Sequence, residues 1–383
     1  MTEYSDNKSN NETSHAVKRP TILVMAGGTG GHIFPGIAVA DALAEQEWKV
    51  HWLGTAERME AKIVPEHGYP ISFINISGIR NKNWQTWLKT PFKIMQSIMQ
   101  SIKILKEVKP DVVLGMGGYA SAPGGVAAWL LGIPLVLHEQ NAVAGMTNRF
   151  LAYLSSETLS AFPGAFNHKI KSRVVGNPLR ANIIAIENII PDQPATSKKV
   201  LVVGGSLGAK ILNDVVPQAM KQIKAQSIDV WHQTGLGNEQ TVLSSYQNYG
   251  LPEEKVKVTE FIDDMAFAYQ WADVVICRAG ALTVSELAMV AKPAIFVPLP
   301  HAVDDHQTKN AMYLVACGAA KLIAQKEFNG TTLGQTLNSI FISDKVVQQM
   351  AKAAHNAAHA HATIDVAQSC IKAAGVSSEV LTS

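Results

Sequence analysis

The chain has 383 residues, of which 47% are hydrophobic and 17% charged, so it can bury the cores of two domains of ordinary size. A net charge of +2 is too small to indicate a nucleic-acid-binding protein, and we expect no nucleic acid among its partners. The three widely spaced cysteines (Cys277, Cys317 and Cys370) give no disulfide framework and no metal knuckle, and they favour a reducing, cytoplasmic compartment.

The N-terminal end of the chain is polar. Residues 1–18 lack the apolar stretch of a secretory signal, so we expect a disordered tail there. Residues 112–137 form an uncharged run that is long enough to cross a membrane. The run contains six glycines and two prolines, however, which argue against one continuous helix. We therefore expect a strand, a glycine turn, a buried helix and a strand, and no transmembrane segment.

Short apolar strands alternate with helices from residue 21 onward. In the first half we expect strands at 21–26, 50–54, 71–77, 111–115 and 134–140, with helices near 37–46, 57–68, 84–108 and 124–132. The pattern starts again with strands at 199–203, 229–235, 256–262, 272–278 and 293–299, and a helix at 211–223. This alternation predicts the α/β class, with two doubly wound, Rossmann-like domains in tandem.

The domain boundaries follow from that repeat. We predict an N-terminal domain at 19–180, a polar linker with Pro191 and Pro194 at 181–198, and a C-terminal domain at 199–357. The remaining segment, 358–383, is expected to form a helix that packs back on the N-terminal domain. Open parallel sheets bind ligands at the carboxyl ends of their strands, so the cleft between the two domains is the expected site.

Three glycine turns follow strands: GGTGGH (27–32), GMGGYAS (115–121) and GGSLGA (204–209). Glycines let a backbone approach a ligand closely, and the start of a following helix favours a phosphate. The alternative is a tight packing turn. The first turn is a poor dinucleotide fingerprint, because Ile33 stands where the third glycine would be.

Two further segments carry polar groups after strands. Thr283 and Glu286 have the spacing of a capping box, so Glu286 either caps the helix or accepts hydrogen bonds from a ribose diol. His301, Asp304, Asp305, His306 and Gln307 contain metal-ligand types, but their spacing favours a polar loop. We expect no metal site.

Seven motifs occur in the order GGTGGH, GMGGYAS, HEQNAVAG, VVGNPLR, GGSLGA, FIDDM and RAGALTVSE, and together they cover about residues 20–360. In this the chain resembles the bacterial MurG family, the UDP-N-acetylglucosamine:undecaprenyl-pyrophosphoryl-N-acetylmuramyl-pentapeptide N-acetylglucosaminyltransferases. The resemblance implies a GT-B fold and inverting transfer of N-acetylglucosamine from UDP to the C4 hydroxyl of the lipid-linked acceptor (lipid I), which forms lipid II. It implies no obligatory metal or cofactor.

The resemblance also implies a donor site. The positions that match the family's UDP-N-acetylglucosamine contacts are Thr29, Gly30, Gly31, Asn141, Arg180, Ser206, Ile262, Ala281, Leu282, Thr283, Val284, Ser285, Glu286 and Gln307. Ser206 would help to hold the diphosphate and Glu286 the ribose, and Arg180 would help to hold the uracil or close the cleft. Leu207 and His306 stand where the family commonly has glutamine, and the loop 301–305 is one residue longer than usual. Those departures concern the sugar contacts more than the uridine contacts.

His32 is the leading candidate for the base that removes the proton of the acceptor hydroxyl. It lies at a helix N-terminus, where the positive end of the dipole disfavours the imidazolium form. The alternative is that His32 only hydrogen-bonds a ligand or the turn itself.

Residues 80–109 combine tryptophans with a local charge of +6, from seven basic residues and one acid. Trp84, Trp87, Lys89, Phe92 and Lys93 suit an anionic membrane surface, so we expect a peripheral protein on the cytoplasmic face of the inner membrane. The alternative is a helix that packs on the sheet and keeps its lysines solvated.

Two other functions remain open. A UDP-sugar enzyme of the same architecture, such as a UDP-N-acetylglucosamine 2-epimerase, would need no lipid acceptor. A nucleotide-binding assembly protein would use GGTGG as a single nucleotide loop, whereas this chain repeats the domain. Cell-wall and division proteins are partners that only the resemblance implies.

Overall fold

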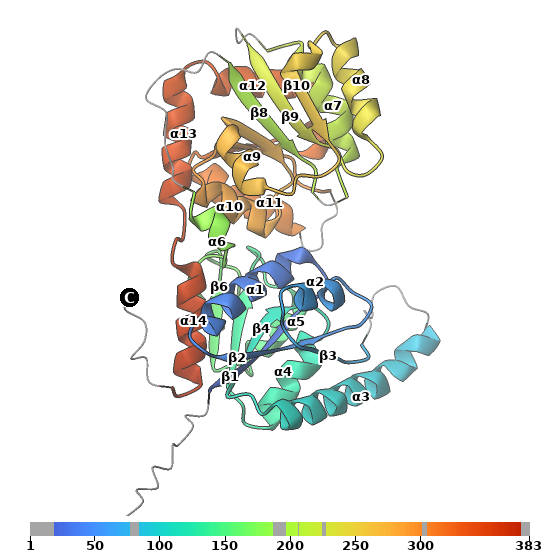
Figure 1. Cartoon of the computed structure of the whole chain (residues 1–383), viewed down its shortest axis with the longest axis vertical. Coiled ribbons are helices and arrows are strands. Elements are labelled where there is room, and N and C mark those ends of the chain that lie inside the picture. The colour runs from blue at the N-terminus through green and yellow to red at the C-terminus, as the bar shows by residue number, and fades with distance from the viewer. Residues whose placement is uncertain are drawn as a thin grey trace, which may run out of the picture.

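Two parallel β-sheets, each covered by helices on both faces, form the two lobes of the molecule (Figure 1). The computed structural model describes residues 19–76, 84–186, 197–205, 207–223, 227–300 and 305–376, and for residues 84–89 it describes the backbone alone. The predicted α/β class with two doubly wound domains is confirmed.

The first sheet has the strand order β3-β2-β1-β4-β5-β6-β7 among the described residues. Its central strands β1 and β4 are buried at every position, because helices cover both faces of a parallel sheet. The last two strands at one end of the sheet, β6 and the edge strand β7, were not predicted from the sequence and are short and more polar. The bounds are β1 Thr21–Ala26, β2 Lys49–Gly54, β3 Ile71–Phe73, β4 Val112–Gly117, β5 Leu135–Glu139, β6 Glu157–Ser160 and β7 Arg173–Val174.

The helices of this lobe are α1 Gly30–Ala44, α2 Glu60–Glu66, α3 Trp84–Val108, α4 Ser121–Leu130 and α5 Met146–Leu151, whereas α6 Ala181–Ile184 packs against helices of the second lobe. The uncharged run at 112–137 is a strand, a turn, a helix and the start of a strand, as predicted. In the part of the chain that the structure describes, no helix is long and apolar enough to span a membrane. The expected start of α1 near residue 37 is wrong: Thr29 is extended, and the helix begins directly at Gly30.

The second sheet has the order β10-β9-β8-β11-β12-β13 over the described residues. Its strands are β8 Lys198–Val203, β9 Ile228–Gln233, β10 Val256–Thr259, β11 Val274–Cys277, β12 Ala294–Phe296 and β13 Ala320–Leu322. The helices around it are α7 Lys210–Met220, α8 Glu239–Asn248, α9 Met265–Trp271, α10 Ala281–Met289, α11 His306–Ala316, α12 Gly330–Ile340 and α13 Asp344–Asn356, with short 3-10 helices at Glu253–Lys255 and Gln325–Glu327.

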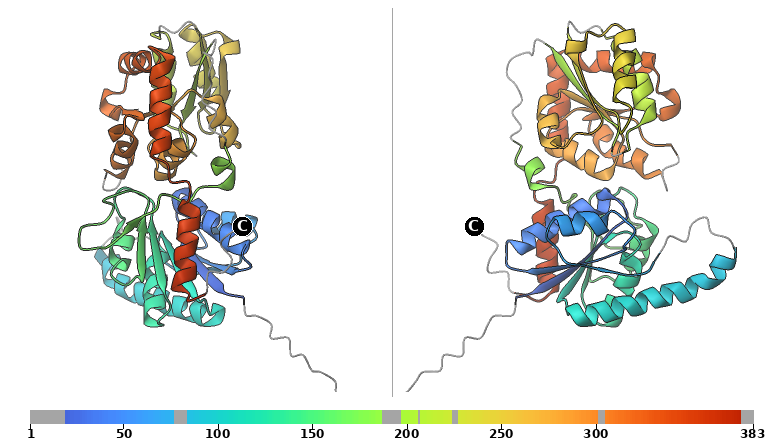
Figure 2. Two further views of the ribbon diagram at one scale, coloured as in Figure 1. Left: turned by 90° about the vertical axis from the view of Figure 1, so that its left-hand side faces the viewer. Right: turned by 45° about the vertical axis from the view of Figure 1, so that its right-hand side comes forward.

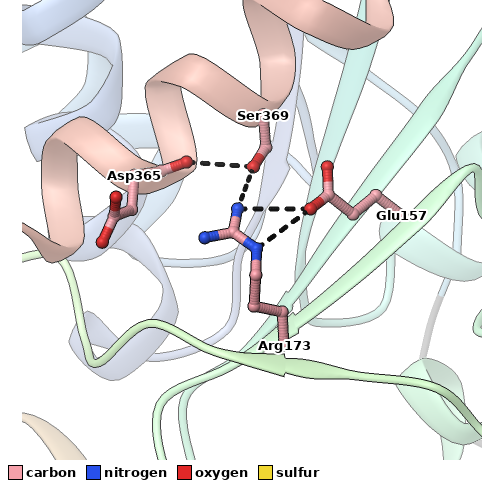
Figure 3. Close-up of polar contacts among 4 residues, drawn as sticks. All are labelled: Glu157, Arg173, Asp365 and Ser369. Atoms are coloured by element: carbon pink, nitrogen blue, oxygen red, sulfur yellow. Dashed lines mark hydrogen bonds and ion pairs between the residues drawn. The ribbon is translucent and has the colours of Figure 1, made fainter.

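The last described helix, α14 (Ala362–Ala373), leaves the second lobe and lies along the first (Figure 2). Val366, Ala367, Cys370 and Ile371 belong to the same apolar cluster as β1, β4 and α1. At the edge of the sheet, Arg173 of β7 donates to Ser369 Oγ (2.7 Å) and to Glu157 Oε1 of β6 (3.2 Å), as Figure 3 shows. The N-terminal lobe is therefore built from two separate parts of the chain.

One of the contacts between the two lobes is apolar. Phe162 of the first lobe packs edge-on against Tyr313 of α11, with ring centroids 5.0 Å apart. Tyr313 also donates to the Ala357 carbonyl (2.7 Å), in the segment between α13 and α14. His359 of that segment lies directly over Gly176, where a Cβ would be 2.2 Å from the His359 Cβ. The segment through which the chain returns from the second lobe to the first is thus packed next to the end of β7.

Candidate active site

The first glycine turn is held from behind by a buried carboxylate. Glu60 at the start of α2 is 1% exposed, and its Oε2 accepts from the Gly28 backbone N–H (2.9 Å). Its other oxygen accepts from the Thr55 N–H (3.0 Å) and hydroxyl (2.7 Å). Gly27 leaves the space for this carboxylate, since a Cβ there would be 2.6 Å from Glu60 Oε1. Glu60 was not predicted from the sequence, because nothing local distinguishes it from a surface glutamate.

The same turn continues with Thr29, Gly30, Gly31 and His32. Thr29 is exposed, whereas Gly30 and Gly31 form the first turn of α1 and are half-buried. A helix N-terminus carries partial positive charge and unpaired N–H groups, so this corner suits a developing anion. The expectation of an anion-facing corner stays a prediction.

His32 is oriented by two other segments. Its Nδ1 lies 2.7 Å from Gln140 Oε1, at the end of β5. Its ring covers Gly117, where a Cβ would be 3.1 Å from His32 Cε1 and where φ is +106°. The neighbouring Gly118 faces the Gly27 carbonyl, 2.5 Å from where its own Cβ would be. At both glycines of the GMGGYAS turn (115–121), the missing Cβ therefore leaves space for neighbouring groups. This is the tight packing turn given above as the alternative to ligand binding.

The HEQNAVAG segment turns around a second buried carboxylate. Glu139 is 2% exposed, and it accepts from the Asn141 N–H (2.9 Å), the Gly145 N–H (3.1 Å) and Asn148 Nδ2 (2.9 Å). With its oxygens so engaged, Glu139 shapes the loop that carries Asn141. Asn141 in turn accepts from Asn310 Nδ2 of α11 across the lobes (3.2 Å).

The RAGALTVSE segment follows β11 and forms the start of α10. Gly280 is the N-cap, so Thr283 lies inside the helix, and the capping-box alternative for Thr283 and Glu286 is wrong. Ala281 and Val284 are buried, while Leu282 and Thr283 are half-buried. Ser285 faces the first lobe, where Asn177 Nδ2 donates to its hydroxyl (3.0 Å) and to the Gln140 carbonyl (3.1 Å). Asn177 therefore joins the two lobes at this corner.

Glu286 and Arg180, both predicted site residues, form an ion pair. Arg180 Nη2 lies 3.2 Å from Glu286 Oε1, and the Tyr269 hydroxyl donates to Oε2 (2.9 Å). Burial raises the pKa of the Glu286 carboxyl, while Arg180 and Tyr269 oppose that rise. Arg180 also lies over the Phe34 ring of α1, 5.7 Å from its centroid. The carboxylate thus sits at the meeting point of both lobes.

The glycine turn of the second lobe, GGSLGA (204–209), is held by a neutral side chain. Gln233 at the end of β9 accepts from the Gly204 N–H (3.0 Å) and donates to the Gly205 carbonyl (3.1 Å). Gly208, with a φ of +71°, lies so close to Thr234 that a Cβ would be 2.1 Å from its carbonyl oxygen. Ser206 lies outside the described residues. Leu207, the departure from the family pattern, is 92% exposed.

The remaining predicted positions lie elsewhere in the second lobe. Ile262 is 6% exposed and packs in the core of the second lobe. Gln307 Oε1 accepts from the Leu299 N–H (2.9 Å), so its amide oxygen ties α11 to the end of β12. His301 and Asp304 lie outside the described residues, and within the described ones no three His, Cys, Asp or Glu side chains are grouped as a metal site would need.

Two family models match the chain. The glycosyltransferase family 28 N-terminal domain matches residues 22–159, and the corresponding C-terminal domain matches residues 199–366. The first range lies in the first lobe, and the second covers the second lobe and the start of α14.

Curated relatives match nearly the whole chain. A UDP-N-acetylglucosamine--N-acetylmuramyl-(pentapeptide) pyrophosphoryl-undecaprenol N-acetylglucosamine transferase of Colwellia psychrerythraea is 58% identical over 91% of this chain and 92% of its own length. The protein with the same name from Aeromonas hydrophila is 53% identical over 91% and 96%.

Solved structures agree. The crystal structure of Acinetobacter baumannii MurG has a TM-score of 0.81 and 38% identity, covering 92% of this chain and 99% of that one. The fold is also shared with a putative UDP-N-acetylglucosamine 2-epimerase from Listeria monocytogenes, at a TM-score of 0.65 and 14% identity. That match covers 92% of this chain and 96% of the epimerase. The chain therefore belongs to the family 28 glycosyltransferases, and within them to the UDP-N-acetylglucosamine--N-acetylmuramyl-(pentapeptide) pyrophosphoryl-undecaprenol N-acetylglucosamine transferases.

Proposed function

We propose that this glycosyltransferase moves N-acetylglucosamine from UDP-N-acetylglucosamine to the C4 hydroxyl of undecaprenyl-pyrophosphoryl-N-acetylmuramyl-pentapeptide. The product is the β1→4-linked disaccharide of lipid II, and the second product is UDP. The observation that carries the proposal is 58% identity over 356 residues to a relative whose name states this transfer. The epimerases are similar only at 14% identity, which supports a common fold and no more.

The acceptor oxygen attacks C1 of the donor sugar from the face opposite UDP. The bond from C1 to the diphosphate oxygen breaks as the new bond forms, so the configuration at C1 inverts. The hydroxyl proton passes to His32, whose Nδ1 is engaged with Gln140 and whose Nε2 has no hydrogen-bond partner among the described residues. A neutral imidazole nitrogen in that position suits a general base.

The second lobe binds the donor in this proposal. The diphosphate lies at the N-terminus of α10, at Ala281, Leu282 and Thr283, and next to the GGSLGA turn with Ser206. Both features stabilise the negative charge of the leaving group. Glu286 and Arg180 hold the ribose and the uracil, Ile262 borders the uracil, and Gln307 contacts the sugar. The charge of the leaving group is met by fixed dipoles, without a metal ion.

One face of α3 fits the surface of an anionic inner membrane, where the lipid acceptor resides. Phe92, Met95 and Met99 are 78%, 57% and 66% exposed and share one side of the helix. Lys103 and Lys106 continue that side, whereas Ser97, Ser101 and Leu105 on the opposite side are buried. On α4, which packs against α3, Trp129 and Leu130 are each 54% exposed. Large apolar side chains flanked by lysines suit a peripheral contact with lipid headgroups.

Transfer is tested with labelled UDP-N-acetylglucosamine and a lipid I analogue, with and without EDTA. We expect a labelled disaccharide product that requires the acceptor and survives EDTA. In the same assay, His32→Ala should lower turnover about 100-fold or more while leaving UDP binding intact. Epimerisation of the donor without use of the acceptor would replace this proposal with the epimerase function, and near-normal turnover of His32→Ala would remove the base assignment alone.

The membrane contact is tested by sedimentation with vesicles that contain phosphatidylglycerol. The double variant Phe92→Ser/Met99→Ser should lose most of its vesicle binding, and high salt should weaken binding of the wild type. Ile342→Ser is the matched control, because Ile342 is 76% exposed in the second lobe. Equal binding by the double variant and the control would contradict the contact. The Trp84, Trp87 and Lys89 side chains lie outside the described ones.

A further inference from the structure

Four groups in the first lobe form one continuous chain of hydrogen bonds that ends on His32. The Gly176 carbonyl oxygen lies 2.8 Å from His138 Nε2, and His138 Nδ1 lies 3.0 Å from Gln140 Nε2. Gln140 Oε1 then lies 2.7 Å from His32 Nδ1. His138 and Gln140 are 0% and 1% exposed, so neither exchanges its partners for bulk water.

The direction of every hydrogen bond in this chain is fixed from its buried end. A carbonyl oxygen only accepts, so His138 must carry its proton on Nε2 to bond with Gly176. Burial lowers the pKa of His138 to about 4, so the ring is neutral near pH 7 and its Nδ1 is an acceptor. The Gln140 amide nitrogen donates to that Nδ1.

A second carbonyl fixes the same amide independently. Gln140 Nε2 also lies 3.0 Å from the His138 backbone carbonyl oxygen, which again can only accept. The amide nitrogen is therefore on the His138 side and the amide oxygen on the His32 side. Because Oε1 has no proton to give, His32 Nδ1 must donate, and in a neutral ring Nε2 then carries the free lone pair.

We infer that Gln140 and His138 are positioning residues that hold His32 in the Nδ1–H tautomer, with Nε2 ready to accept the proton of the acceptor hydroxyl. This assignment rests on the proposed transfer function. The partner of the base is a neutral amide, unlike the carboxylate that orients the histidine of a serine protease triad. It orders the tautomer without adding a buried negative charge next to the imidazole. The Gly117 position, which has no Cβ, leaves the ring room to adopt this orientation.

The tautomer is read directly by nitrogen NMR of the full-length protein labelled with 15N-histidine. The His32 signals are assigned by their loss in His32→Asn. In the wild type at neutral pH we expect a protonated Nδ1 and an unprotonated Nε2. In Gln140→Met, which keeps the length of the side chain but has no acceptor, we expect the Nε2–H tautomer to appear.

Kinetics provide the second measurement. Gln140→Met should lower kcat roughly 10- to 100-fold, with little change in KM for the donor, because part of the enzyme carries the proton on the wrong nitrogen. His138→Phe should have a smaller effect, since the His138 backbone carbonyl still orients the amide. For the NMR measurement alone, Gln233→Met is the matched control: it removes a buried strand-end glutamine of the second lobe and should leave the His32 signals unchanged.

The outcomes separate this inference from the proposed function. An Nε2–H tautomer in the wild type, or an unchanged tautomer in Gln140→Met, would overturn it. A changed tautomer with unchanged kcat would also overturn the positioning role. Absence of acceptor-dependent product from the wild type would instead remove the proposed function, while the tautomer measured by NMR would still stand.

Discussion

The two lobes hold their glycine turns in chemically opposite ways. In the first lobe a buried carboxylate, Glu60, accepts the Gly28 N–H from behind the turn. In the second lobe the neutral amide of Gln233 accepts the Gly204 N–H and also donates to the Gly205 carbonyl. Both side chains are nearly fully buried, at 1% and 3% exposure.

This difference matches the charges that the two turns face in the proposed reaction. The second turn faces the diphosphate of the donor, and a fixed anion behind it would repel that ligand through a medium of low polarity. The first turn carries His32, which becomes positive as it takes the proton of the neutral acceptor hydroxyl. A negative charge behind that turn does no harm. In the proposed reaction the carboxylate thus stands behind the turn that carries the base, and the neutral amide stands behind the turn that faces the diphosphate.

Removal of Glu60 should have the largest effect. Glu60→Ala leaves the Gly28 N–H, the Thr55 N–H and the Thr55 hydroxyl without their acceptor, and should lower the free energy of unfolding of the first lobe by about 4 kcal/mol. Urea unfolding measures this loss. Glu66→Ala is the control on the same helix, because its carboxylate is exposed and pairs only with Lys62. A loss within 1 kcal/mol of that control, on the order of experimental error, would contradict the role of Glu60.

The second lobe is tested by adding a charge. Gln233→Glu should weaken UDP binding about 100-fold, since one buried charge near the diphosphate costs about 3 kcal/mol at intermediate polarity. Gln233→Met removes the same hydrogen bonds without a charge and should lose less. Calorimetry with UDP and with uridine separates the two effects, because uridine has no phosphate. Equal UDP affinities of the two variants would show that charge is not what excludes a carboxylate here.

Buried neutral histidines should make both lobes less stable to unfolding as the pH falls. Burial lowers the pKa of His138 to about 4 and that of His232, in β9, to about 3. Each contributes its full stability above the unfolded pKa of about 6.5, and loses it as the pH falls towards the folded value. Below pH 6.5 the loss is up to about 1.4 kcal/mol per pH unit for each histidine.

Urea unfolding between pH 7.5 and 5 measures this slope. His232→Asn should flatten the part that belongs to the second lobe, and His138→Asn the part that belongs to the first. A wild-type stability that stays constant over this range would contradict the neutral state of both rings. The comparison between the lobes would then rest on Glu60 and Gln233 alone.

The smallest change in the free energy of unfolding is expected when an exposed ion pair is removed, and this change serves as a reference in both lobes. Lys210 and Asp214 form an i,i+4 pair on α7, with side chains 88% and 48% exposed. Asp214→Ala should change the free energy of unfolding by less than about 0.5 kcal/mol, as should Glu66→Ala in the first lobe. Unequal losses in urea unfolding would show that surface charges, as well as buried ones, distinguish the two lobes.

The sequence predicted the elements that its local pattern encodes. Apolar runs identified the central strands, and the repeat of strand, glycine turn and helix identified two doubly wound domains. The start of α1 was missed because Gly30 and Gly31 indicate a turn, yet they form its first helical turn. β6, β7 and β13 were missed because they are two to four residues long and lie towards the sheet edges.

The site was predicted less completely, for a physical reason. His32, Arg180 and Glu286 follow motif positions, but their partners are set by contacts between distant parts of the chain. Glu60 meets Gly28 across 32 positions, and Gln140 meets His32 across 108. Gln140 and Asn177 stand in the quoted motifs, whereas Glu60 and Asn310 do not, but no local pattern marks any of the four as the group that orients a turn, a ring or the other lobe.

The return of α14 to the first lobe reverses the order in which the lobes are completed during synthesis. Domains generally fold as they emerge, N-terminal part first. Here part of one face of the first sheet, over β4, β5 and β6, stays uncovered until Val366, Ala367, Cys370 and Ile371 have left the ribosome, after the described strands and helices of the second lobe. The lobe that is made first is therefore finished last, and a chain cut between α13 and α14 would carry an intact second lobe and an incomplete first one.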